Sequence, residues 1–277
     1  MSWNIDGLDG VGGAEALMRR SLAVALEVGR RRPFAVFLQE CVPAAIKLLE
    51  AKQVLGGSYD FHMPRNPKMP YYVAILTDRR RVQLLQGPET IDFPWSQMGR
   101  QLLSVTVTAD GRRDVPLILA TAHLESTKDC GGERTRQLSH SLNYMRTAAL
   151  KVVRTAVARG GVAYSRRVAP TCVFGGDLNL RDEEFRAVQK ELGDAASGIE
   201  DVWSWCGSDE AERYTWDTSV NTNLDAGFKS RTRFDRLFFL APGISAGPRA
   251  QPGADGGAEG ASKHAGAGGN GWQPIDF

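Results

Sequence analysis

Short apolar runs of strand type alternate along this chain with segments of helical periodicity, and that alternation limits the folds open to it. The runs are rich in β-branched and aromatic residues, and we expect buried strands at 34–38, 71–76, 102–108, 115–122, 171–174 and 237–240. Helical spacing of apolar residues is found at 14–31, 43–52, 133–159 and 182–192. Because several strands follow one another without a helix, the pattern favours an α/β fold in which two sheets pack face to face with helices outside. A doubly wound parallel sheet is the competing arrangement.

Composition sets limits on the domains and partners. With 277 residues, 42% of them hydrophobic, the chain can bury one large core, which we expect within residues 1–240. Residues 241–271 are dominated by Gly, Ala and Pro and are expected to form a flexible loop or tail. The formal charge of +2 neither requires nor excludes a nucleic-acid partner. Such a partner would need a local basic cluster, for example Arg231, Arg233 and Arg236.

Nothing in the sequence predicts a membrane-spanning or secreted protein. The chain has no apolar run of about 18 residues, and its N-terminus lacks a basic region followed by an apolar one. Its four cysteines show neither a CxxC pair nor zinc-site spacing, so we expect them to be reduced in an intracellular protein.

The string from Gly175 to Asp182, GGDLNLRD, directly follows the strand expected at 171–174. We expect the two glycines to let the backbone turn sharply as it leaves that strand. Asp177 and Asn179 would then stand at the carboxyl end of the strand, where a carboxylate and an amide suit a hard cation and a phosphate oxygen. Taken alone, the same string is also a good turn.

Three further polar residues allow a functional and a structural interpretation. Glu40 closes the run at 34–38 and is either a Mg²⁺ ligand or a solvated strand end. Asn4 either orients a ligand or forms an Asx turn before Gly7. His123 follows the run that ends at 122 and could donate to a phosphate oxygen, whereas a lone histidine is more often a core residue. Its polar neighbours Glu125 and Ser126 favour the functional interpretation.

Two other places allow a functional and a structural interpretation. Asp235 lies between two arginines and is either half of a surface ion pair or a carboxylate that orients a histidine or a metal ligand. Tyr214 and Trp216 lie in a polar stretch, where they could stack on bases or an aryl leaving group, or pin the loop to the core.

Together and in this order, these strings resemble the endonuclease/exonuclease/phosphatase superfamily, and within it the tyrosyl-DNA phosphodiesterases. The narrower likeness rests on segments 3–9, 123–127, 133–138, 214–218 and 233–236. The resemblance implies a four-layer α/β/β/α sandwich of two mixed sheets flanked by helices. It also implies hydrolysis of the 5′-phosphotyrosyl bond that topoisomerase II leaves on DNA, with Mg²⁺, or alternatively Mn²⁺, as the metal. The protein would be a monomer of the nucleus, with the cytoplasm as a further location.

The resemblance also implies a role for each matched residue. Residues matched to metal ligands are Glu40, Asp177 and Asn179. Residues matched to catalytic positions for water, phosphate or a histidine are Asn4, His123, Asp177, Asn179 and Asp235. Residues matched to positions that bind phosphate, DNA or the substrate are Ser126, Arg181, Tyr214 and Trp216.

The chain departs from the family at both ends. The family closes with a Ser-Asp-His string after a proline, whereas here Phe277 follows Pro274, Ile275 and Asp276, so that Phe277 stands where the histidine belongs. Only two residues precede the first motif. We therefore expect incomplete terminal strands, a remnant of the closing motif at 272–277 and impaired catalysis, in a fragment or a natural variant. The alternatives are a non-catalytic binder of DNA ends and another phosphodiesterase or phosphatase of the same superfamily.

Overall fold

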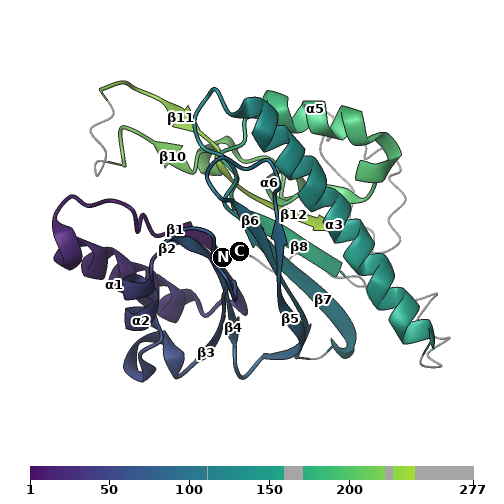
Figure 1. Cartoon of the computed structure of the whole chain (residues 1–277), viewed down its shortest axis with the longest axis horizontal. Helices are drawn as coiled ribbons and strands as arrows, with labels where there is room; N and C mark the ends of the chain where they lie inside the picture. Colours follow the sequence, from purple (N-terminus) through teal and green to yellow (C-terminus); the bar gives the residue numbers. More distant parts are fainter. Residues whose placement is uncertain (111, 159–170, 222–226, 241–277) are drawn as a thin grey trace, which may run out of the picture.

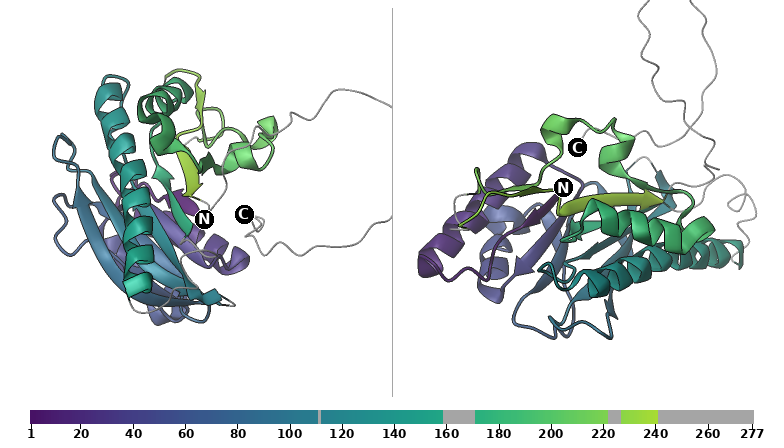
Figure 2. Two further views of the ribbon diagram at one scale, coloured as in Figure 1. Left: turned by 90° about the vertical axis from the view of Figure 1, so that its right-hand side faces the viewer. Right: turned by 90° about the horizontal axis from the view of Figure 1, so that it is seen from above.

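The computed structural model describes residues 1–110, 112–158, 171–221 and 227–240. The loop or tail expected at 241–271 and the closing-motif remnant expected at 272–277 lie outside these residues. Two β-sheets face each other, with α1 and α2 on one side and α3 and α5 on the other (Figures 1 and 2). The expected α/β/β/α sandwich is therefore confirmed, and a single doubly wound sheet is wrong.

The first sheet has four strands in the order β1-β2-β4-β3. These are β1 (Ser2–Asn4), β2 (Ala35–Cys41), β3 (Tyr59–His62) and β4 (Tyr72–Asp78). Strand β1 runs parallel to β2, and the other pairs are antiparallel. The elements that cover this sheet are α1 (Gly13–Arg31), α2 (Pro43–Leu49) and the short π-helix η1 (Lys52–Gly56).

The second sheet has six strands in the order β5-β6-β7-β8-β12-β9. Its strands are β5 (Val82–Asp92), β6 (Gln101–Ala109), β7 (Arg112–Ala122), β8 (Thr171–Asp177), β9 (Ile199–Asp201) and β12 (Asp235–Leu240). Only β7 and β8 pair in parallel among the described strands of this sheet. Helices α3 (Gly131–Ala158) and α5 (Asp182–Leu192) pack on its outer face.

The remaining elements are short. Strands β10 (Trp216–Asp217) and β11 (Arg231–Thr232) form a separate two-stranded ribbon. Beside the second sheet lie α6 (Val202–Trp205) and the 3₁₀ turns η2 (Gly193–Ala196) and η3 (Glu210–Glu212). No helix among the described residues is long and apolar enough to cross a membrane.

The alternation of side chains along the strands produces separate core layers. Val36 and Leu38 of β2 pack under α1 and α2, whereas Phe37 between them packs against the second sheet. Strand β6 divides in the same way, because Leu102 faces α3 while Leu103 faces the first sheet. Period-two alternation between two buried faces is the physical reason that apolar runs without polar breaks form these strands.

The structure corrects the role expected for the glycines of the GGDLNLRD string. Gly175 and Gly176 lie inside β8 rather than in a turn after it. A Cβ at Gly175 would stand 2.4 Å from the Arg236 carbonyl oxygen, and one at Gly176 would stand 2.1 Å from that of Ala122. Gly176 also has φ of +148°. Close approach of neighbouring strands, not a turn, therefore requires these glycines.

A Gly176→Ala variant should consequently be destabilised by at least about 2 kcal/mol, because overpacking and backbone strain add. Urea denaturation followed by fluorescence measures this free energy of unfolding. Gly132→Ala is the matched control, since a Cβ there would meet nothing within 4 Å. A Gly176→Ala variant as stable as Gly132→Ala would contradict the strand packing described here.

Candidate active site

The candidate site lies where the carboxyl ends of four strands from both sheets meet. Asn4 ends β1, Glu40 stands near the end of β2, His123 follows β7 and Asp177 ends β8. A buried contact beneath them joins the sheets: Gln39 donates to the Thr121 hydroxyl over 3.3 Å. The fold therefore brings together residues that are up to 173 positions apart in the sequence.

Asn4 links the two carboxylates. Its Nδ2 donates to Glu40 Oε1 over 3.1 Å and to Asp177 Oδ2 over 3.0 Å. Its Oδ1 accepts the backbone N–H of Asp6 over 2.8 Å. Asn4 therefore forms the expected Asx turn, and that turn also fixes its amide between the two carboxylates. The catalytic role of Asn4 stays a prediction.

Glu40 occupies an irregular position in β2. The pairing register with β4 shifts between Leu38 and Cys41, and Glu40 has φ of +53°. Strand irregularities of this kind re-aim side chains and are concentrated at functional sites. Burial raises the pKa of the Glu40 carboxyl, the Asn4 hydrogen bond lowers it, and the carboxylates of Asp177 and Asp6 raise it further. The charged form of Glu40 would therefore gain from a nearby cation.

His123 is held as a neutral imidazole. Only 3% of the residue is exposed, and burial lowers its pKa to about 4. Arg100 can only donate, so its contact of 2.9 Å makes His123 Nδ1 the acceptor and leaves the hydrogen on Nε2. Nε2 stands 3.6 Å from Asp177 Oδ2. His123 can therefore donate a hydrogen bond into the space beside Asp177.

Arg100 is the residue that sequence reasoning missed. It is 7% exposed, donates to Ser126 Oγ over 3.0 Å, and has its guanidinium carbon 5.3 Å from the centre of the Tyr71 ring. It precedes an expected strand as an isolated arginine, so no motif or spacing marks it. A small cavity lined by Glu40, Arg100 and His123 lies at this point.

Asn179 and Ser126 complete the polar group. Asn179 has φ of +50°, and its backbone N–H donates to Asp177 Oδ1 over 3.1 Å. Its side-chain Nδ2 lies 3.4 Å from Ser126 Oγ and 3.3 Å from the Leu124 carbonyl oxygen. The string after β8 is thus a turn that also presents an amide to the site.

Two buried charged residues support this loop without facing the site. Glu125 Oε1 accepts from Ser96 Oγ over 2.7 Å and from the N–H groups of Gln97 and Met98, over 2.7 and 3.1 Å. Glu125 therefore holds the segment that leads to Arg100. Arg134 of α3 donates to the carbonyl oxygens of Glu125 and Thr127, over 2.8 and 2.7 Å.

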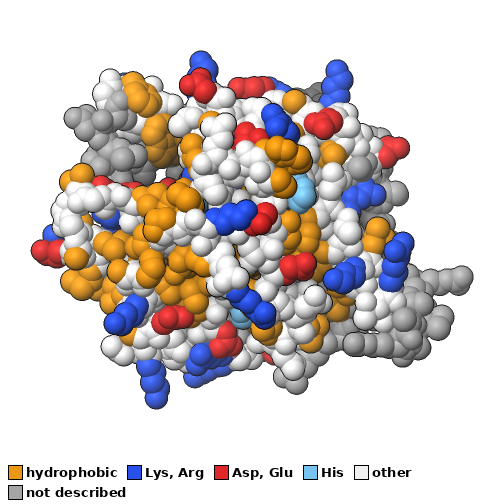
Figure 3. Space-filling model, viewed as in Figure 1, with side chains coloured by type: hydrophobic (Ala, Val, Ile, Leu, Met, Phe, Trp, Pro, Cys, Tyr) orange, Lys and Arg blue, Asp and Glu red, His pale blue; other side chains and the backbone are white. Residues whose placement is uncertain are grey.

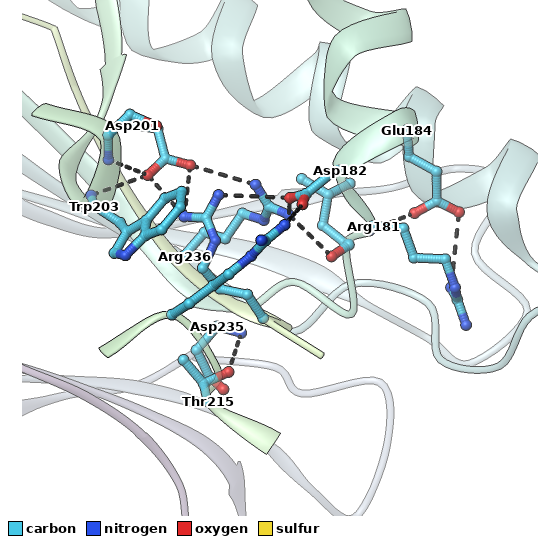
Figure 4. Close-up of polar contacts among 12 residues, drawn as sticks. Arg181, Asp182, Glu184, Asp201, Trp203, Thr215, Asp235 and Arg236 are labelled. Carbon is cyan, nitrogen blue, oxygen red and sulfur yellow. Dashed lines mark hydrogen bonds and ion pairs between the residues drawn. The ribbon is translucent and has the colours of Figure 1, made fainter. Parts of the chain in front are cut away.

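Asp235 begins β12 and pairs with Asp177 across the strands. Its backbone N–H donates to the Thr215 hydroxyl over 3.0 Å, as Figure 4 shows. Burial and the neighbouring Asp177 carboxylate raise the pKa of Asp235 to about 7. The surface ion pair with flanking arginines is therefore wrong, since Asp235 faces another carboxylate.

Those arginines also do not form the basic surface cluster that the sequence suggested. Arg233 and Arg236 are 7% and 3% exposed, and both bind Asp201 and Asp182. Figure 4 draws Arg236 between these two carboxylates. Arg231 is exposed but pairs with Asp217 over 2.7 Å. On the face drawn in Figure 3, basic and acidic side chains are interspersed without a broad basic patch.

The expected DNA-lining residues lie on the β8 and β12 side. Arg181 directly precedes α5, with its guanidinium carbon 5.8 Å from the centre of the Phe234 ring. Trp216 packs on Phe234 with ring centres 5.5 Å apart, which supports the pinning interpretation. Tyr214 is 37% exposed, and the Arg231 guanidinium carbon lies 4.5 Å from its ring centre.

The cysteines are reduced, as expected, and two further histidines make structural contacts. His62 is buried against the Thr77 hydroxyl, and His140 packs edge-on against Phe93. His264 lies outside the described residues. All four cysteines are free.

Comparison with known proteins identifies the family. The sequence profile of the Endonuclease/Exonuclease/phosphatase family matches residues 1–239. The chain belongs to this family.

Several relatives of the chain are tyrosyl-DNA phosphodiesterases 2. The Gallus gallus protein is 37% identical over 239 residues, which cover 86% of this chain and 55% of that protein. The Homo sapiens protein is 33% identical, over 87% of this chain and 57% of that protein. The chain therefore spans little more than half the length of these curated relatives.

A solved structure of D. rerio TDP2 complexed with single-strand DNA product resembles this chain with a TM-score of 0.67 and 34% identity. The matched region covers 91% of this chain and 84% of the D. rerio chain. The human Nocturnin catalytic domain, at 15% identity and a TM-score of 0.55, shares the fold.

As a member of this family, the chain should have a site for a divalent cation. The carboxylates of the candidate active site are suited to hold such an ion. No group of three or more His, Cys, Asp or Glu is arranged around an ion position among the described residues. Instead, Glu40 and Asp177 converge on Asn4, close to Asp6 and Asp235. Mg²⁺ is commonly held by one or two carboxylates together with water and substrate phosphate. The three-residue ligand set of Glu40, Asp177 and Asn179 stays a prediction.

Proposed function

We propose that this chain is the catalytic domain of a divalent-metal-dependent tyrosyl-DNA phosphodiesterase, which hydrolyses 5′-phosphotyrosyl bonds in the repair of topoisomerase II adducts on DNA. The observation that carries this proposal is the convergence of Asn4, His123 and two carboxylates in one polar site, in a chain similar to tyrosyl-DNA phosphodiesterases 2. The protein would act as a monomer in the nucleus, with the cytoplasm as a further location.

The donors of the site suit a phosphodiester. The Nε2–H of His123 lies beside Asp177 and can donate to a phosphate oxygen. The Ser126 hydroxyl accepts from Arg100 and from the Asn179 amide, which leaves its own O–H as a second donor for the phosphate. Because their positions are fixed by hydrogen bonds within the fold, little reorganisation is needed when negative charge develops. A Mg²⁺ or Mn²⁺ ion bound by Glu40 and Asp177 would polarise the phosphoryl group and help to generate the nucleophilic water.

Arg100 supplies positive charge near the cavity. A phenolate leaves more readily than an alkoxide because the phenol has a pKa near ~10. The buried guanidinium of Arg100, with the Tyr71 ring beside it, suits the negative charge that grows on the tyrosine oxygen.

An Arg100→Met variant should therefore lower kcat on a 5′-phosphotyrosyl oligonucleotide by about 100-fold, the usual order for one lost charge-stabilising donor. The loss should be smaller on a 5′-nitrophenyl ester, whose leaving group needs less stabilisation. Comparing kcat for both esters checks this expectation. Equal losses would mean that Arg100 acts by fixing His123 and Ser126 instead.

The direct test mixes the purified chain with a 5′-phosphotyrosyl oligonucleotide and Mg²⁺. Tyrosine should be released, and an Asp177→Asn variant should lose that release while Asp60→Asn, at a distant surface site, keeps it. Binding of 5′-modified DNA without release, weakening as salt rises, would instead identify a non-catalytic binder of DNA ends. Turnover of a phosphoinositide, sphingomyelin or an abasic site alone would assign another activity of the superfamily.

A further inference from the structure

A groove of about 560 Å³ opens beside the candidate active site. One wall is the segment 65–68, which precedes β4, and includes Arg65, Asn66 and Lys68. The other wall is built by β5 and the start of β6. Pro88, Thr90 and Asp92 alternate along β5 and so lie on one face of the sheet, with Gln101 next to them on β6.

The groove and the small cavity of the candidate active site are neighbours. Gln101 lines both this groove and the small cavity at Glu40, Arg100 and His123. It is 8% exposed, and its Nε2 donates to Asp92 Oδ1 over 2.8 Å. A substrate group that extends from the cavity past Gln101 would therefore reach the groove.

The position of the groove separates it from the expected DNA-lining residues. In the sheet order, β5 and β6 lie on one side of β7, whereas β8 and β12 lie on the other. Arg181 and Trp216 belong to the β8 and β12 side. A 5′-phosphotyrosyl group has two organic substituents on one phosphorus, the DNA oxygen and the tyrosine oxygen, and they diverge. If the DNA lies on the β8 and β12 side, the tyrosine lies toward Arg100 and the groove.

The lining chemistry favours a polypeptide over nucleic acid. Arg65 and Lys68 are cationic, but Asp92 lies among them and pairs with Lys68 over 2.9 Å. Grooves that follow a nucleic-acid backbone are uniformly basic, because phosphates only accept hydrogen bonds. A peptide backbone both donates and accepts. The amides of Asn66 and Gln101, the Thr90 hydroxyl and the Asp92 carboxylate offer both partners.

We propose that this groove binds the peptide attached to the tyrosine on the leaving-group side of the substrate. The inference rests on the proposed function and adds a second substrate-binding region to it. The groove volume falls within the range of about 300–1,000 Å³ typical of ligand pockets, enough for a short extended segment next to the tyrosine. Arg65 remains to pair with an acidic residue of that segment.

The test compares two substrates on the same oligonucleotide, one carrying tyrosine alone and one carrying a tyrosine-containing peptide of several residues with an acidic side chain. The peptide substrate should have a kcat/KM about tenfold higher, the effect of one charge-assisted hydrogen bond. Arg65→Glu and the groove-filling Thr90→Trp should each remove that advantage and leave turnover of the tyrosine substrate unchanged. Arg80→Glu is the matched charge control, since Arg80 lies in the turn between β4 and β5 at the opposite end of the sheets.

If Arg65→Glu and Thr90→Trp lower kcat/KM equally for both substrates, and the loss grows with oligonucleotide length, the groove binds DNA and the proposal is overturned. Equal kcat/KM values for both substrates in the unmodified chain would overturn it while the proposed function stands. A binding measurement, which needs no turnover, separates the peptide-binding role of the groove from the proposed function. Fluorescence anisotropy with Glu40→Gln should give about tenfold tighter binding of the peptide conjugate, lost on addition of Arg65→Glu. If the peptide conjugate binds more tightly but the unmodified chain hydrolyses neither substrate, the peptide-binding role of the groove stands and the proposed function is refuted. Equal affinities for the two conjugates would refute the peptide-binding role of the groove.

Discussion

A Glu40→Gln variant should lose metal-dependent hydrolysis of a 5′-phosphotyrosyl oligonucleotide by more than about 100-fold. Replacing a residue that only supports a metal ligand lowers metal affinity or activity by about 10–100-fold, so replacing a direct ligand should lower activity further. Glutamine keeps the size of the side chain and its contact with Asn4 but removes the negative charge. The measurement is kcat/KM over a series of Mg²⁺ concentrations.

The same variant should fold normally. Burial and the carboxylates of Asp177 and Asp6 raise the pKa of Glu40, so its charge is unfavourable in the absence of a cation. Without metal, Glu40→Gln should therefore melt at the same or a higher temperature than the unmodified chain. Adding Mg²⁺ should raise the melting temperature of the unmodified chain only, because binding to the folded state stabilises it.

The exposed Glu50, at the end of α2, provides the matched control for this substitution. Glu50→Gln should retain both turnover and the shift with Mg²⁺. Unchanged turnover in Glu40→Gln would remove Glu40 from the metal site and leave Asp177 as the ligand to test next.

An Asp201→Ala variant should be destabilised by about 3–5 kcal/mol, the cost of removing one partner of a buried ion pair. Asp201 is 4% exposed and accepts from Arg233 over 2.8 Å and from Arg236 over 3.4 Å. It also caps α6 by accepting the N–H of Trp203. Arg233 and Arg236 both pair with Asp201 and Asp182. Without the Asp201 carboxylate, these two buried guanidinium groups would share the single negative charge of Asp182.

Equilibrium unfolding in urea measures the loss. Asp60→Ala is the control, because Asp60 pairs with Arg79 over 2.7 Å while both side chains are half exposed. A pair in that setting contributes under about 1 kcal/mol. If Asp201→Ala cost no more than Asp60→Ala, the buried network would not hold β9, β12 and the start of α5 together.

The same network bears on activity because it touches the segments that carry the site. Arg236 follows Asp235 in β12, Asp182 follows Arg181, and Arg213 precedes Tyr214 and pairs with Asp182 over 2.8 Å. Burial raises the pKa of Asp182, but hydrogen bonds from Arg236 and Arg213 outweigh it and bring the pKa to about 2. Asp182 therefore stays charged in the folded protein down to strongly acidic pH.

Elements with strong local patterns could be predicted from the sequence. The expected helix at 14–31 is found as α1, and the helix expected at 182–192 as α5. Strands β3, β5 and β9 were not predicted. Strand β5 contains Gly87 and Pro88 and several exposed residues, so it lacks the apolar run that marks a strand, and pairing with β6 determines it instead.

Site prediction depended on where a polar residue stands relative to a strand. Glu40, His123 and Asp177 each follow or end an apolar run, whereas Asn4 was marked only by the motif it belongs to. The structure gathers all four at one edge. Arg100 and the groove beside it have no such signal. Their environment is created by residues that flank other strands, such as Tyr71 before β4 and His123 after β7.

The sequence by itself determined the layers, because alternation along a strand and periodicity along a helix are local properties of neighbouring residues. It also determined which strand ends carry polar groups. Only the tertiary structure decided that Arg233 and Arg236 are buried ion-pair partners, that Gly175 and Gly176 serve close strand packing, and that Arg100 contacts His123. Burial, close approach and pairing depend on residues that are distant in the chain, and no local pattern specifies them.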